Sequence, residues 1–593
     1  MAQGRSRFGQ LLLKKGIITP DILDKALQIQ EEETGPNARE LGKILVHDFN
    51  INHDAVYGLL AEMYAFRTIE LDPQKLDESE IDRMKQLLSK FPEDFRKELV
   101  YKKCLPYRIA FGHRNTLIIL AADPTIKLLE SIPHKTEFKK YEVVYCRLSI
   151  LEELIELVAP QKNEFLELFE EADEQIEETS SSDKDLDEYA LDEEINKSLL
   201  VNLFEACLVE AVRKGASDIH IIPFEKSNVD FYFRIDGKLT KWYRQENTSP
   251  EAIAAVVKDR AEGVDRFERA TAQDGFAQRM IDNHLIRFRI SIIPITSTEF
   301  TRNFESIVIR TIDDRNVITD LKKLGFQAKA EEDFFRSINK SKGIVMVTGP
   351  TGSGKSTTLM AALYNVIDPS KCVLTVEDPV EYSIHGARQL KISNRLTFEQ
   401  AIRAILRHDP DIVMVGEIRD KTTAETAVKL ANTGHLTFST LHTNDAPSAI
   451  SRLYKMGVEP FLLAYTINII VAQRLVRKLC THCREPLGED KYKAALRLGL
   501  TQEDLDSGKV YQAGPGCKKC HNGYKGRVNI CEALYFSPEV RKTVAESGTE
   551  IDEDKIREVA EGQGMLSLLE SGLDRIRNGL TTIEEIEYAT SED

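Results

Sequence analysis

The sequence predicts a multidomain α/β protein whose largest domain contains a parallel sheet. Three observations favour this fold class. Residues 320–479 alternate apolar, strand-like runs with helix-like segments, which is the pattern of a parallel sheet connected by helices. A second region that combines helices and strands precedes it, over residues 196–318. The chain has 593 residues, enough for roughly four domains of ordinary size.

Residues 1–65 predict a helical module. Apolar side chains recur at helical spacing on both sides of a turn at residues 16–20, so two short amphipathic helices are expected there. A weaker echo over residues 41–60 follows after a spacer. The first module is therefore expected to contain a duplicated helical unit, over residues 7–64.

A small α/β domain and an acidic linker follow. Residues 66–160 combine a strand at 116–120 with a helix at 151–157. Residues 161–195 form the linker, in which the stretch 164–194 holds fifteen acidic residues and one lysine and so carries −14 of the formal net charge of −17. Such a segment is expected to be extended and self-repelling, and it leaves the rest of the chain nearly neutral.

Residues 196–318 predict a second amino-terminal α/β domain. A helix is expected from about residue 197 to 214, before an alternating strand at 230–237. That strand ends in Asp-Gly, which is a hairpin signal. Further strands at 285–293 and 305–312 complete the domain.

A phosphate-binding motif begins the largest domain. Residues 349–356 read G-x-x-x-x-G-K-S and follow the apolar run 344–347, the strand that such a loop requires. The glycines let backbone N–H groups face phosphates, Lys355 reaches the β and γ phosphates, and Ser356 supplies a hydroxyl to Mg²⁺. The motif identifies a nucleotide-binding protein. The residues expected to bind the nucleotide are Gly349, Pro350, Thr351, Gly352, Ser353, Gly354, Lys355, Ser356 and Thr357.

Carboxylates follow two other strands of the predicted sheet. The strand 373–376 ends in a segment that holds Glu377 and Glu381, and either carboxylate could polarise an attacking water. The strand 412–415 ends in Gly-Glu, so Glu417 is expected to hold Mg²⁺ directly or through water. Each could instead be a capped strand end, but the neighbouring phosphate loop favours the catalytic interpretation.

Residues 434–445 form a further strand with two histidines and four hydroxyl side chains, a composition suited to sensing a γ-phosphate. The order and spacing of the four motifs over about residues 195–590 resemble the secretion and type IV pilus traffic ATPases, the GspE/PilB family. The resemblance implies a RecA-like P-loop ATPase core at residues 319–479.

The resemblance also implies roles for site residues. Glu381 would be the catalytic carboxylate, with Glu377 the alternative. Glu417 would act through Mg²⁺, and His442 would sense the phosphate state. Family members are hexamers in which the second amino-terminal domain supplies arginines to phosphates when the domains close, and an arginine of this kind is worth about 10³ to 10⁵ in rate. The matching arginines are Arg234, Arg289 and Arg310.

Two segments depart from the family pattern. Residues 270–276 lack both the proline and the arginine of the usual Pro-Gln-Asp-Gly-Arg stretch. The segment 297–303 is longer than in the usual family pattern, and Phe304 stands where that pattern has a glycine. The departures bear on the geometry of the arginines rather than on the fold.

Two Cys-x-x-Cys pairs, thirty-three residues apart, predict a metal site in residues 480–533. Four thiolates leave no open position, so Zn²⁺ would be structural, and an iron–sulfur centre is the alternative. The five other cysteines are scattered, which favours a reducing compartment. Assembly motors of the family carry the same tetrad and retraction motors generally lack it. Residues 534–593 are expected to be helical. The predicted ligands are Cys480, Cys483, Cys517 and Cys520.

The amino-terminal module resembles the cyclic di-GMP binding module found in some of these motors. The first half has the matching pattern at Arg7, Gly9, Leu12, Gly16, Leu23, Leu27 and Gln30. In the second half, the matching positions hold Glu40, Phe49 and Met63, so the module is degenerate. The alternative is that the leucines are only the core of two packed helix pairs.

The sequence therefore predicts a cytoplasmic, homohexameric ATPase that assembles type IV pili or type II secretion pseudopili. No signal peptide or run of 18 apolar residues is visible, so contact with the inner face of the membrane would come through a platform protein and other assembly partners. A retraction motor, a nucleotide sensor and a P-loop nucleic-acid translocase are the alternatives. No nucleic acid is expected as a partner, because no basic stripe is present. Both assembly systems use this core, and the duplicated helical module favours pili.

Overall fold

The computed structural model divides the chain into two units, Met1–Asn163 and Glu164–Asp593, which are described separately. The predicted acidic linker, residues 161–195, and most of the long segment 297–303 lie outside the described residues. The described residues are 2–33, 39–49, 51–110, 116–159, 199–224, 227–296, 303–393, 395–548 and 550–591.

The first unit begins with four helices that pack around one apolar core. Close helix packing depends on Gly9, since a β-carbon there would press on the Leu23 side chain. The helices start at ordinary signals: Pro20 begins the second, and the Asn52 side chain caps the fourth by accepting from Ala55 N. The four are α1 (Ala2–Lys14), α2 (Pro20–Glu32), α3 (Leu41–His47) and α4 (His53–Met63).

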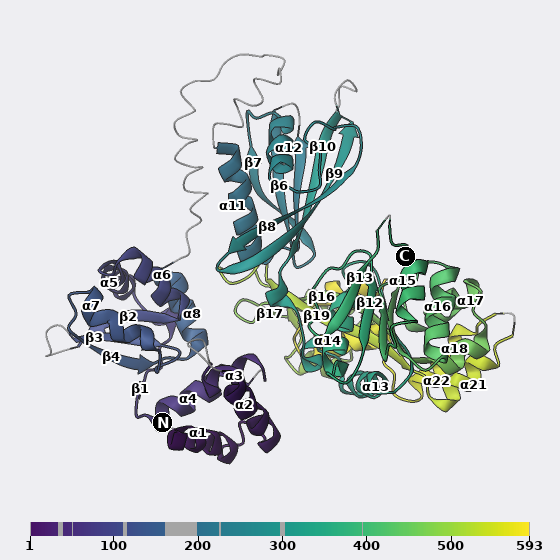
Figure 1. Cartoon of the computed structure of the whole chain (residues 1–593), viewed down its shortest axis with the longest axis horizontal. Coiled ribbons are helices and arrows are strands. Elements are labelled where there is room, and N and C mark those ends of the chain that lie inside the picture. Colours follow the sequence, from purple (N-terminus) through teal and green to yellow (C-terminus); the bar gives the residue numbers. More distant parts are fainter. Residues whose placement is uncertain are drawn as a thin grey trace. The chain divides into compact units, whose positions relative to one another are not determined.

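The same unit contains a four-stranded sheet in the order β1-β4-β3-β2, flanked by helices (Figure 1). The predicted strand at 116–120 is its most buried strand. The strands are β1 (Arg67–Thr68), β2 (Cys104–Ile109), β3 (Thr116–Ala121) and β4 (Lys140–Tyr145). The helices are α5 (Glu78–Ser89), α6 (Glu93–Tyr101), α7 (Ile132–Lys135) and α8 (Leu148–Val158).

The second unit begins with an antiparallel six-stranded sheet in the order β7-β6-β5-β10-β9-β8. Helices α11 (Leu199–Arg213) and α12 (Pro250–Asp259) pack on one face, where alternate strand residues form an apolar core (Figure 1). The predicted Asp-Gly hairpin connects β6 to β7. The strands are β5 (Asp218–Phe224), β6 (Asn228–Ile235), β7 (Lys238–Gln245), β8 (Gln273–Ile281), β9 (His284–Thr296) and β10 (Asn303–Ile312).

A seven-stranded sheet forms the centre of the second unit, in the order β13-β12-β14-β15-β11-β16-β19. All neighbours are parallel except β16 and β19. The central strands β11, β14 and β15 are buried along their whole length because helices cover both faces of the sheet (Figure 1). The strands are β11 (Gly343–Thr348), β12 (Val373–Glu377), β13 (Ala387–Lys391), β14 (Ile412–Val415), β15 (Leu436–Leu441), β16 (Ile467–Leu479) and β19 (Tyr524–Tyr535).

Helices on the two faces of this sheet belong to different apolar clusters. One face is covered by α13 and α14, and the other by α16, α17 and α18. A separate cluster holds α15 against β12 and β14. The helices are α13 (Ala328–Ile338), α14 (Lys355–Val366), α15 (Phe398–Ile405), α16 (Lys421–Asn432), α17 (Ala446–Lys455) and α18 (Pro460–Thr466).

The cysteine-containing segment is an insertion between two paired strands. Residues 524–535, which the sequence places within the metal subdomain 480–533 or just beyond it, form β19 and pair with β16 in the central sheet. Between them lie a two-stranded sheet and two short helices. These are β17 (Glu485–Pro486), α19 (Tyr492–Leu498), α20 (Gln502–Asp506) and β18 (Tyr511–Gln512).

The carboxyl-terminal residues are helical, as predicted, and pack in two directions. Helices α21 and α22 share an apolar core with α17 and α18. Helices α23 and α24 pack against the inserted segment and its flanking strands. None of the helices within the described residues is both long enough and apolar enough to cross a bilayer. The four helices are α21 (Pro538–Ala545), α22 (Glu553–Glu561), α23 (Leu568–Arg577) and α24 (Ile583–Thr590).

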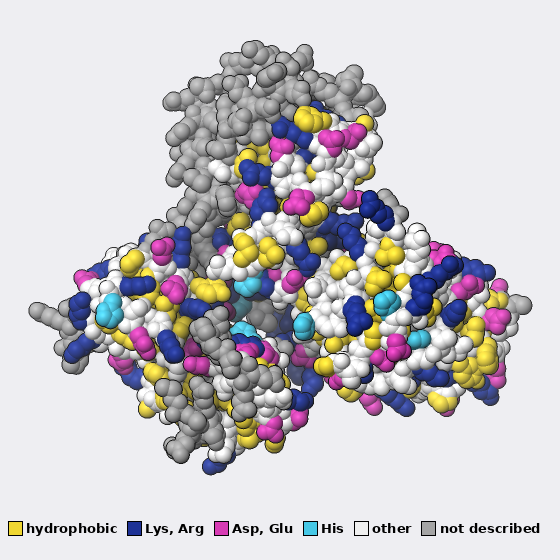
Figure 2. Space-filling model, in the orientation of Figure 1, with side chains coloured by type: hydrophobic (Ala, Val, Ile, Leu, Met, Phe, Trp, Pro, Cys, Tyr) yellow, Lys and Arg dark blue, Asp and Glu magenta, His cyan; other side chains and the backbone are white. Residues whose placement is uncertain are grey.

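Charged side chains of both signs are interspersed on the face of the molecule drawn in Figure 2. A protein that tracks a nucleic-acid backbone needs lysines and arginines gathered along one groove. Among the described residues visible in that view, this face offers no support for the translocase alternative.

Candidate nucleotide site

The phosphate loop, residues 349–356, connects the buried strand β11 to the first turn of α14. Its ends adopt conformations that favour glycine: φ is 142° at Gly349 and 90° at Gly354. A β-carbon at Gly349 would also collide with the carbonyl oxygen of Gln473. The loop therefore presents the unpaired N–H groups at the start of a helix, which is a favourable place for an anion.

Lys355 folds back over the phosphate loop. Its Nζ donates to two loop carbonyl oxygens, of Gly349 at 2.8 Å and of Pro350 at 3.0 Å. Burial lowers the pKa of Lys355, whereas the carboxylates of Glu417 and Glu381 raise it. These contributions place both carboxylates within electrostatic reach of the ammonium group. The structure therefore brings the predicted lysine and the two acidic residues to one edge of the sheet.

Glu377 and Glu381 both follow β12 but have different surroundings. The Glu377 carboxylate accepts hydrogen bonds from the Thr375 hydroxyl, at 2.6 Å, and from Gln389 Nε2, at 2.9 Å. Burial raises the pKa of Glu377, against the opposing effect of these two bonds. Glu381 is more accessible, with 39% of its side chain exposed, and lies 3.9 Å from Arg310. Glu377 is thus held by two hydrogen bonds, whereas Glu381 is partly exposed beside Arg310.

Glu417 lies beside His442 at the ends of β14 and β15. Its Oε1 lies 3.2 Å from His442 Nε2, and its Oε2 accepts from Arg419 Nε at 2.8 Å. Burial lowers the pKa of His442, the Lys355 ammonium lowers it further, and Glu417 raises it. The net direction is downward, so the ring is mainly neutral near pH 7.

The segment that follows β15 is tied to the last residue of β11. The Thr348 hydroxyl accepts from Thr443 N at 2.8 Å and lies 2.8 Å from the Thr443 hydroxyl. Thr348 directly precedes the phosphate loop and Thr443 directly follows His442. These hydrogen bonds therefore connect the histidine segment directly to the start of the loop.

The two histidines of residues 434–445 do different things. His442 joins the phosphate-loop edge, as described above. His435 lies before β15 starts, and its Nδ1 is 2.9 Å from the carbonyl oxygen of Leu430 at the end of α16. His435 therefore helps to end a helix and does not belong to the site.

The three predicted arginines lie on the face of the six-stranded sheet that α11 and α12 leave open. Strand register places them in one row with a carboxylate, because Asp218 pairs with both Arg234 and Arg310, and Arg310 pairs with Arg289. Asp218 Oδ1 accepts from Arg310 Nε at 3.1 Å, and its Oδ2 lies 3.8 Å from Arg234 Nε. We call these four residues the arginine row.

The side chain of Gln273 holds the altered segment, residues 270–276, in place. Gln273 donates to the carbonyl oxygens of Asp265, at 3.1 Å, and Glu268, at 2.8 Å. Phe276 stands opposite Arg289 in the β8–β9 register and is 48% exposed. Phe304, by contrast, is buried at the start of β10. Phe276 is thus a neighbour of the arginine row, whereas Phe304 lies six residues before Arg310 along β10, and the strands of the row keep their pairing.

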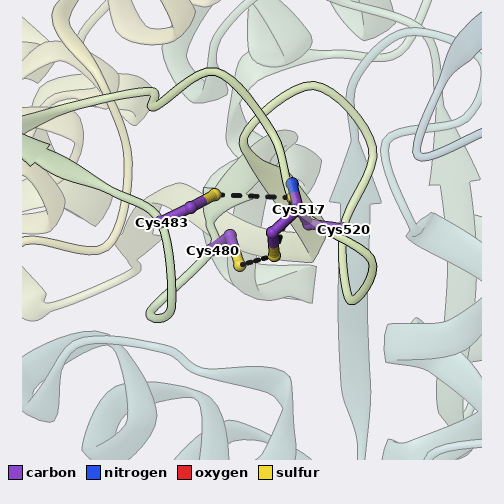
Figure 3. Close-up of side chains that lie close together, drawn as sticks. All are labelled: Cys480, Cys483, Cys517 and Cys520. Atoms are coloured by element: carbon purple, nitrogen blue, oxygen red, sulfur yellow. Dashed lines mark hydrogen bonds between the residues drawn. The ribbon is translucent and has the colours of Figure 1, made fainter.

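The four predicted cysteine ligands meet in one cluster, which we call the cysteine cluster (Figure 3). Their sulfur atoms all lie within 4.8 Å of one another. The separation is 3.8 Å for Cys480 and Cys517, and 3.6 Å for Cys483 and Cys520. A zinc ion with four thiolates at its usual distance has sulfur atoms about 3.8 Å apart. The cluster therefore fits a closed tetrahedral zinc site.

Two polar residues of the site were not identified from the sequence. Asp218 lies on β5, and its role depends on strand pairing with residues 16 and 92 positions away. Gln389 lies on β13 and holds Glu377 through the β12–β13 pairing. The alternation of β5 indicates that Asp218 and His220 share a face, but it carries no information about which residues lie opposite.

The chain matches the family model described as type II/IV secretion system protein over residues 193–588. It is 34% identical to the type IV pilus assembly ATPase PilB of Myxococcus xanthus, over 99% of both chains. It is 37% identical to the type II secretion system ATPase E of Vibrio cholerae, over 79% of this chain and 88% of that one.

A solved structure supports the fold. The ATPase DotB of Yersinia pseudotuberculosis is 20% identical, with a TM-score of 0.51, and the match covers 66% of this chain and 93% of DotB. The fold class predicted from the sequence is confirmed. The match to the family model and the 34% identity over 99% of both chains show which family the chain belongs to. The chain belongs to the type II/IV secretion system protein family and is an ATPase.

Proposed function

We propose that this ATPase is a motor that couples ATP hydrolysis to the assembly of type IV pili or type II secretion pseudopili. The observation that carries the proposal is the match to the M. xanthus pilus assembly ATPase over 99% of both chains. The secretion ATPase of V. cholerae matches over 79% of this chain. The match to the pilus assembly ATPase includes the helical module. Of pilus assembly and type II secretion, it therefore favours pilus assembly.

The phosphate loop and Lys355 would bind the nucleotide. The loop N–H groups at the start of α14 favour phosphate, and Lys355 would exchange its bonds to the loop carbonyls for bonds to phosphate oxygens. Ser356, whose side chain is exposed in the first turn of α14, would contribute its hydroxyl to magnesium. Bound magnesium neutralises charge on the phosphates.

Glu381 is the proposed catalytic carboxylate. Two hydrogen bonds hold Glu377 in place, whereas Glu381 is accessible and within electrostatic reach of Lys355. An accessible carboxylate can orient and polarise the attacking water. Glu377 is the alternative, because burial raises its pKa and so makes its ionised form a stronger base than an ordinary glutamate.

Glu417 and His442 form the proposed phosphate-sensing pair. Glu417 would hold magnesium through water, while the largely neutral ring of His442 could donate or accept a hydrogen bond. Because the histidine segment is tied to Thr348, a change in phosphate occupancy would be felt at the start of the phosphate loop.

The arginine row would complete the site. Arg234, Arg289 and Arg310 are proposed to stabilise the charge of the phosphates, and Asp218 would fix two of them until a phosphate competes for their donors. The proximity of Arg310 to Glu381 supports this assignment. The proposal includes a homohexamer in which closure of the sheet domain on the core is the power stroke.

The cysteine cluster is proposed to bind zinc as a structural staple. Four thiolates in a tetrahedron leave no coordination position for substrate. The cluster joins the two ends of the insertion at the tip of the β16–β19 pair, so its energy would stabilise the fold of that insertion.

Cyclic di-GMP is the candidate ligand of the helical module, residues 1–65, and the alternative is that the leucines serve only as the core of two packed helix pairs. The pattern that supports binding lies in the first half, because Glu40, Phe49 and Met63 replace the matching residues of the second. Isothermal calorimetry with cyclic di-GMP tests the assignment. Heat that saturates with ligand supports binding, and the absence of heat contradicts it.

The motor proposal includes a place in the cell. The protein would act in the cytoplasm at the inner face of the membrane, held there by a platform protein and other assembly partners. The names of the relatives support this placement, since they are assembly and secretion ATPases.

Complementation of a gene deletion tests the function. We expect the wild-type gene to restore surface pili, and Lys355→Ala, expressed at the same level, to fail. Lys371→Ala is the matched control, because Lys371 lies in the same core outside the phosphate loop. Restored assembly by Lys355→Ala would contradict the motor proposal, and restored enzyme secretion without pili would assign the protein to type II secretion.

A further inference from the structure

A buried glutamine connects β16 to the phosphate loop. Gln473 is 1% exposed, and both ends of its amide are used. Its Nε2 donates to the carbonyl oxygen of Ser353 at 2.8 Å, and its Oε1 accepts from the Thr358 hydroxyl at 2.9 Å. Ser353 lies in the middle of the loop and Thr358 lies one turn into α14. The single side chain therefore spans the loop-to-helix junction.

The partners determine the orientation of the amide. The Ser353 carbonyl oxygen can only accept, so the NH₂ group of Gln473 must face it. The amide oxygen then faces the Thr358 hydroxyl, which has a proton to donate. A side chain without both a donor and an acceptor cannot replace this pair of bonds.

The loop fits closely around this residue. A β-carbon at Gly349 would collide with the backbone oxygen of Gln473, and one at Gly354 would lie 3.1 Å from its Nε2. The absence of side chains at these two glycines thus lets both ends of the loop approach β16. Glycine at these two positions therefore serves the packing of the loop on β16 as well as the exposure of its N–H groups to phosphate.

The bond to Ser353 has a consequence for the nucleotide. In a trans peptide, the C=O of one residue and the N–H of the next point in opposite directions. Holding the Ser353 carbonyl toward Gln473 therefore turns the N–H of Gly354 away from β16. A phosphate loop works by turning such N–H groups toward the phosphates.

We propose that Gln473 is a positioning residue of the nucleotide site, which sets the orientation of the Ser353–Gly354 peptide and so pre-organises the loop for phosphate. Loss of its donor would leave the buried Ser353 carbonyl without its partner and let the peptide rotate. The expected result is weaker nucleotide binding in a chain that is otherwise folded.

The test compares full-length variants for binding of a fluorescent N-methylanthraniloyl ATP analogue with Mg²⁺. We expect Gln473→Leu to weaken binding by about tenfold or more, since a buried polar group loses its partner. Gln245→Leu is the matched control. Gln245 is also buried, and its Nε2 donates to a backbone carbonyl, of Glu246, and to the Thr248 hydroxyl, far along the chain from the loop. Nucleotide binding by the control variant should be unchanged.

The variant Gln473→Glu makes the pH dependence of nucleotide affinity a test, because a purely structural role for Gln473 would not change that dependence. A carboxylate cannot donate to the Ser353 carbonyl, but a protonated carboxylic acid can. We expect the affinity of this variant, relative to wild type, to rise as the pH falls from 8 to 6. Parallel pH profiles for the two proteins would overturn the proposal, as would wild-type affinity in Gln473→Leu.

If Gln473→Leu does not fold, substitutions of its partner Thr358 test the proposal instead. Thr358→Val removes the hydroxyl that orients the amide, and Thr358→Ser keeps it. We expect several-fold weaker binding in the valine variant and wild-type binding in the serine variant. Wild-type binding in both would overturn the proposal.

Discussion

Asp218 accepts a hydrogen bond from Arg310 Nε at 3.1 Å, and its second carboxylate oxygen lies 3.8 Å from Arg234 Nε. One carboxylate on β5 thus orients arginines on the strands at both sides. Asp218 is nearly buried whereas the Arg310 side chain is half exposed. Asp218 therefore holds Arg310 at its Nε, whereas the terminal nitrogens of Arg234 also contact the carbonyl oxygen of Gly237, at 3.0 Å, and His220 Nε2, at 3.4 Å.

Asp218→Asn is expected to lower the ATPase rate while leaving the fold intact. The amide is isosteric but carries no charge, so the hold on Arg310 and the ion pair with Arg234 are weakened, and a displacement of about 1 Å costs about 100-fold in rate. Steady-state ATPase assays measure the effect. Asp314→Asn is the control, because Asp314 pairs with Arg287 on the same sheet outside the row. Equal rates in the two variants would mean that Asp218 has no special role.

The lowered pKa of His442 predicts its reactivity. Below its pKa the ring is protonated and does not react with diethyl pyrocarbonate, so labelling of His442 against pH reports that pKa. We expect a midpoint below the ordinary value of 6.5, because burial and Lys355 both disfavour the charged ring. Lys355→Ala should raise the midpoint, and Glu417→Gln should lower it. Peptide mass spectrometry measures the labelling, and a wild-type midpoint above 6.5 would contradict the assignment.

The cysteine cluster predicts a metal content of about one zinc per chain. Elemental analysis of protein purified without chelator measures it. Cys517→Ser should reduce the metal content and lower the melting temperature, since metal binding contributes to the folding energy of the insertion. Cys372→Ser is the control, because Cys372 lies outside the cluster. Iron with visible absorbance would favour the iron–sulfur alternative, and a metal-free wild type would contradict both.

Glu532 predicts a pH-dependent effect on stability. It is 1% exposed on β19, and Arg557 of α22 donates to it at 3.1 Å. Burial raises the pKa of Glu532, while Arg557 lowers it. A raised carboxyl pKa stabilises the folded chain at low pH, and the stabilisation is lost as pH rises from the unfolded value through the folded one.

Arg557→Met should therefore destabilise the chain more at pH 8 than at pH 6. Without the arginine, the pKa of Glu532 rises further and its ionised form is left unpaired, at a cost of about 3 kcal/mol. Melting temperatures at the two pH values measure the difference. Glu532→Gln in the same variant should remove the pH dependence, and an equal loss of stability at both pH values would show that the carboxylate is not responsible.

Local sequence signals predicted the phosphate loop and the strands around it because each is encoded within a few residues. The apolar run before Gly349 and the Gly-Glu after β14 required no knowledge of distant segments. The two histidines could also have been separated, since His435 and His442 are seven residues apart on an extended strand, about 23 Å end to end. The sequence interpretation joined them because it weighed composition rather than length.

Long-range pairing was not predictable from local patterns. The strand β19 pairs with β16 across an insertion of more than forty residues, and its alternation alone does not name a partner. The same applies to Asp218, whose role depends on register with β6 and β10, and to Gln473, which reads as one of several polar residues in a mainly apolar strand. In each case the missing information was a contact between segments far apart in the chain.

The proposed motor depends on hydrolysis of ATP at the edge of the central sheet, with Glu381 as the proposed group that activates water. Single-turnover hydrolysis and nucleotide affinity should be measured together in Glu381→Gln and Glu377→Gln. We predict that Glu381→Gln binds the nucleotide as wild type does but hydrolyses it about 100-fold more slowly or worse. Wild-type hydrolysis in Glu381→Gln, with the loss of hydrolysis appearing in Glu377→Gln instead, would contradict the assignment of Glu381 as the group that activates water.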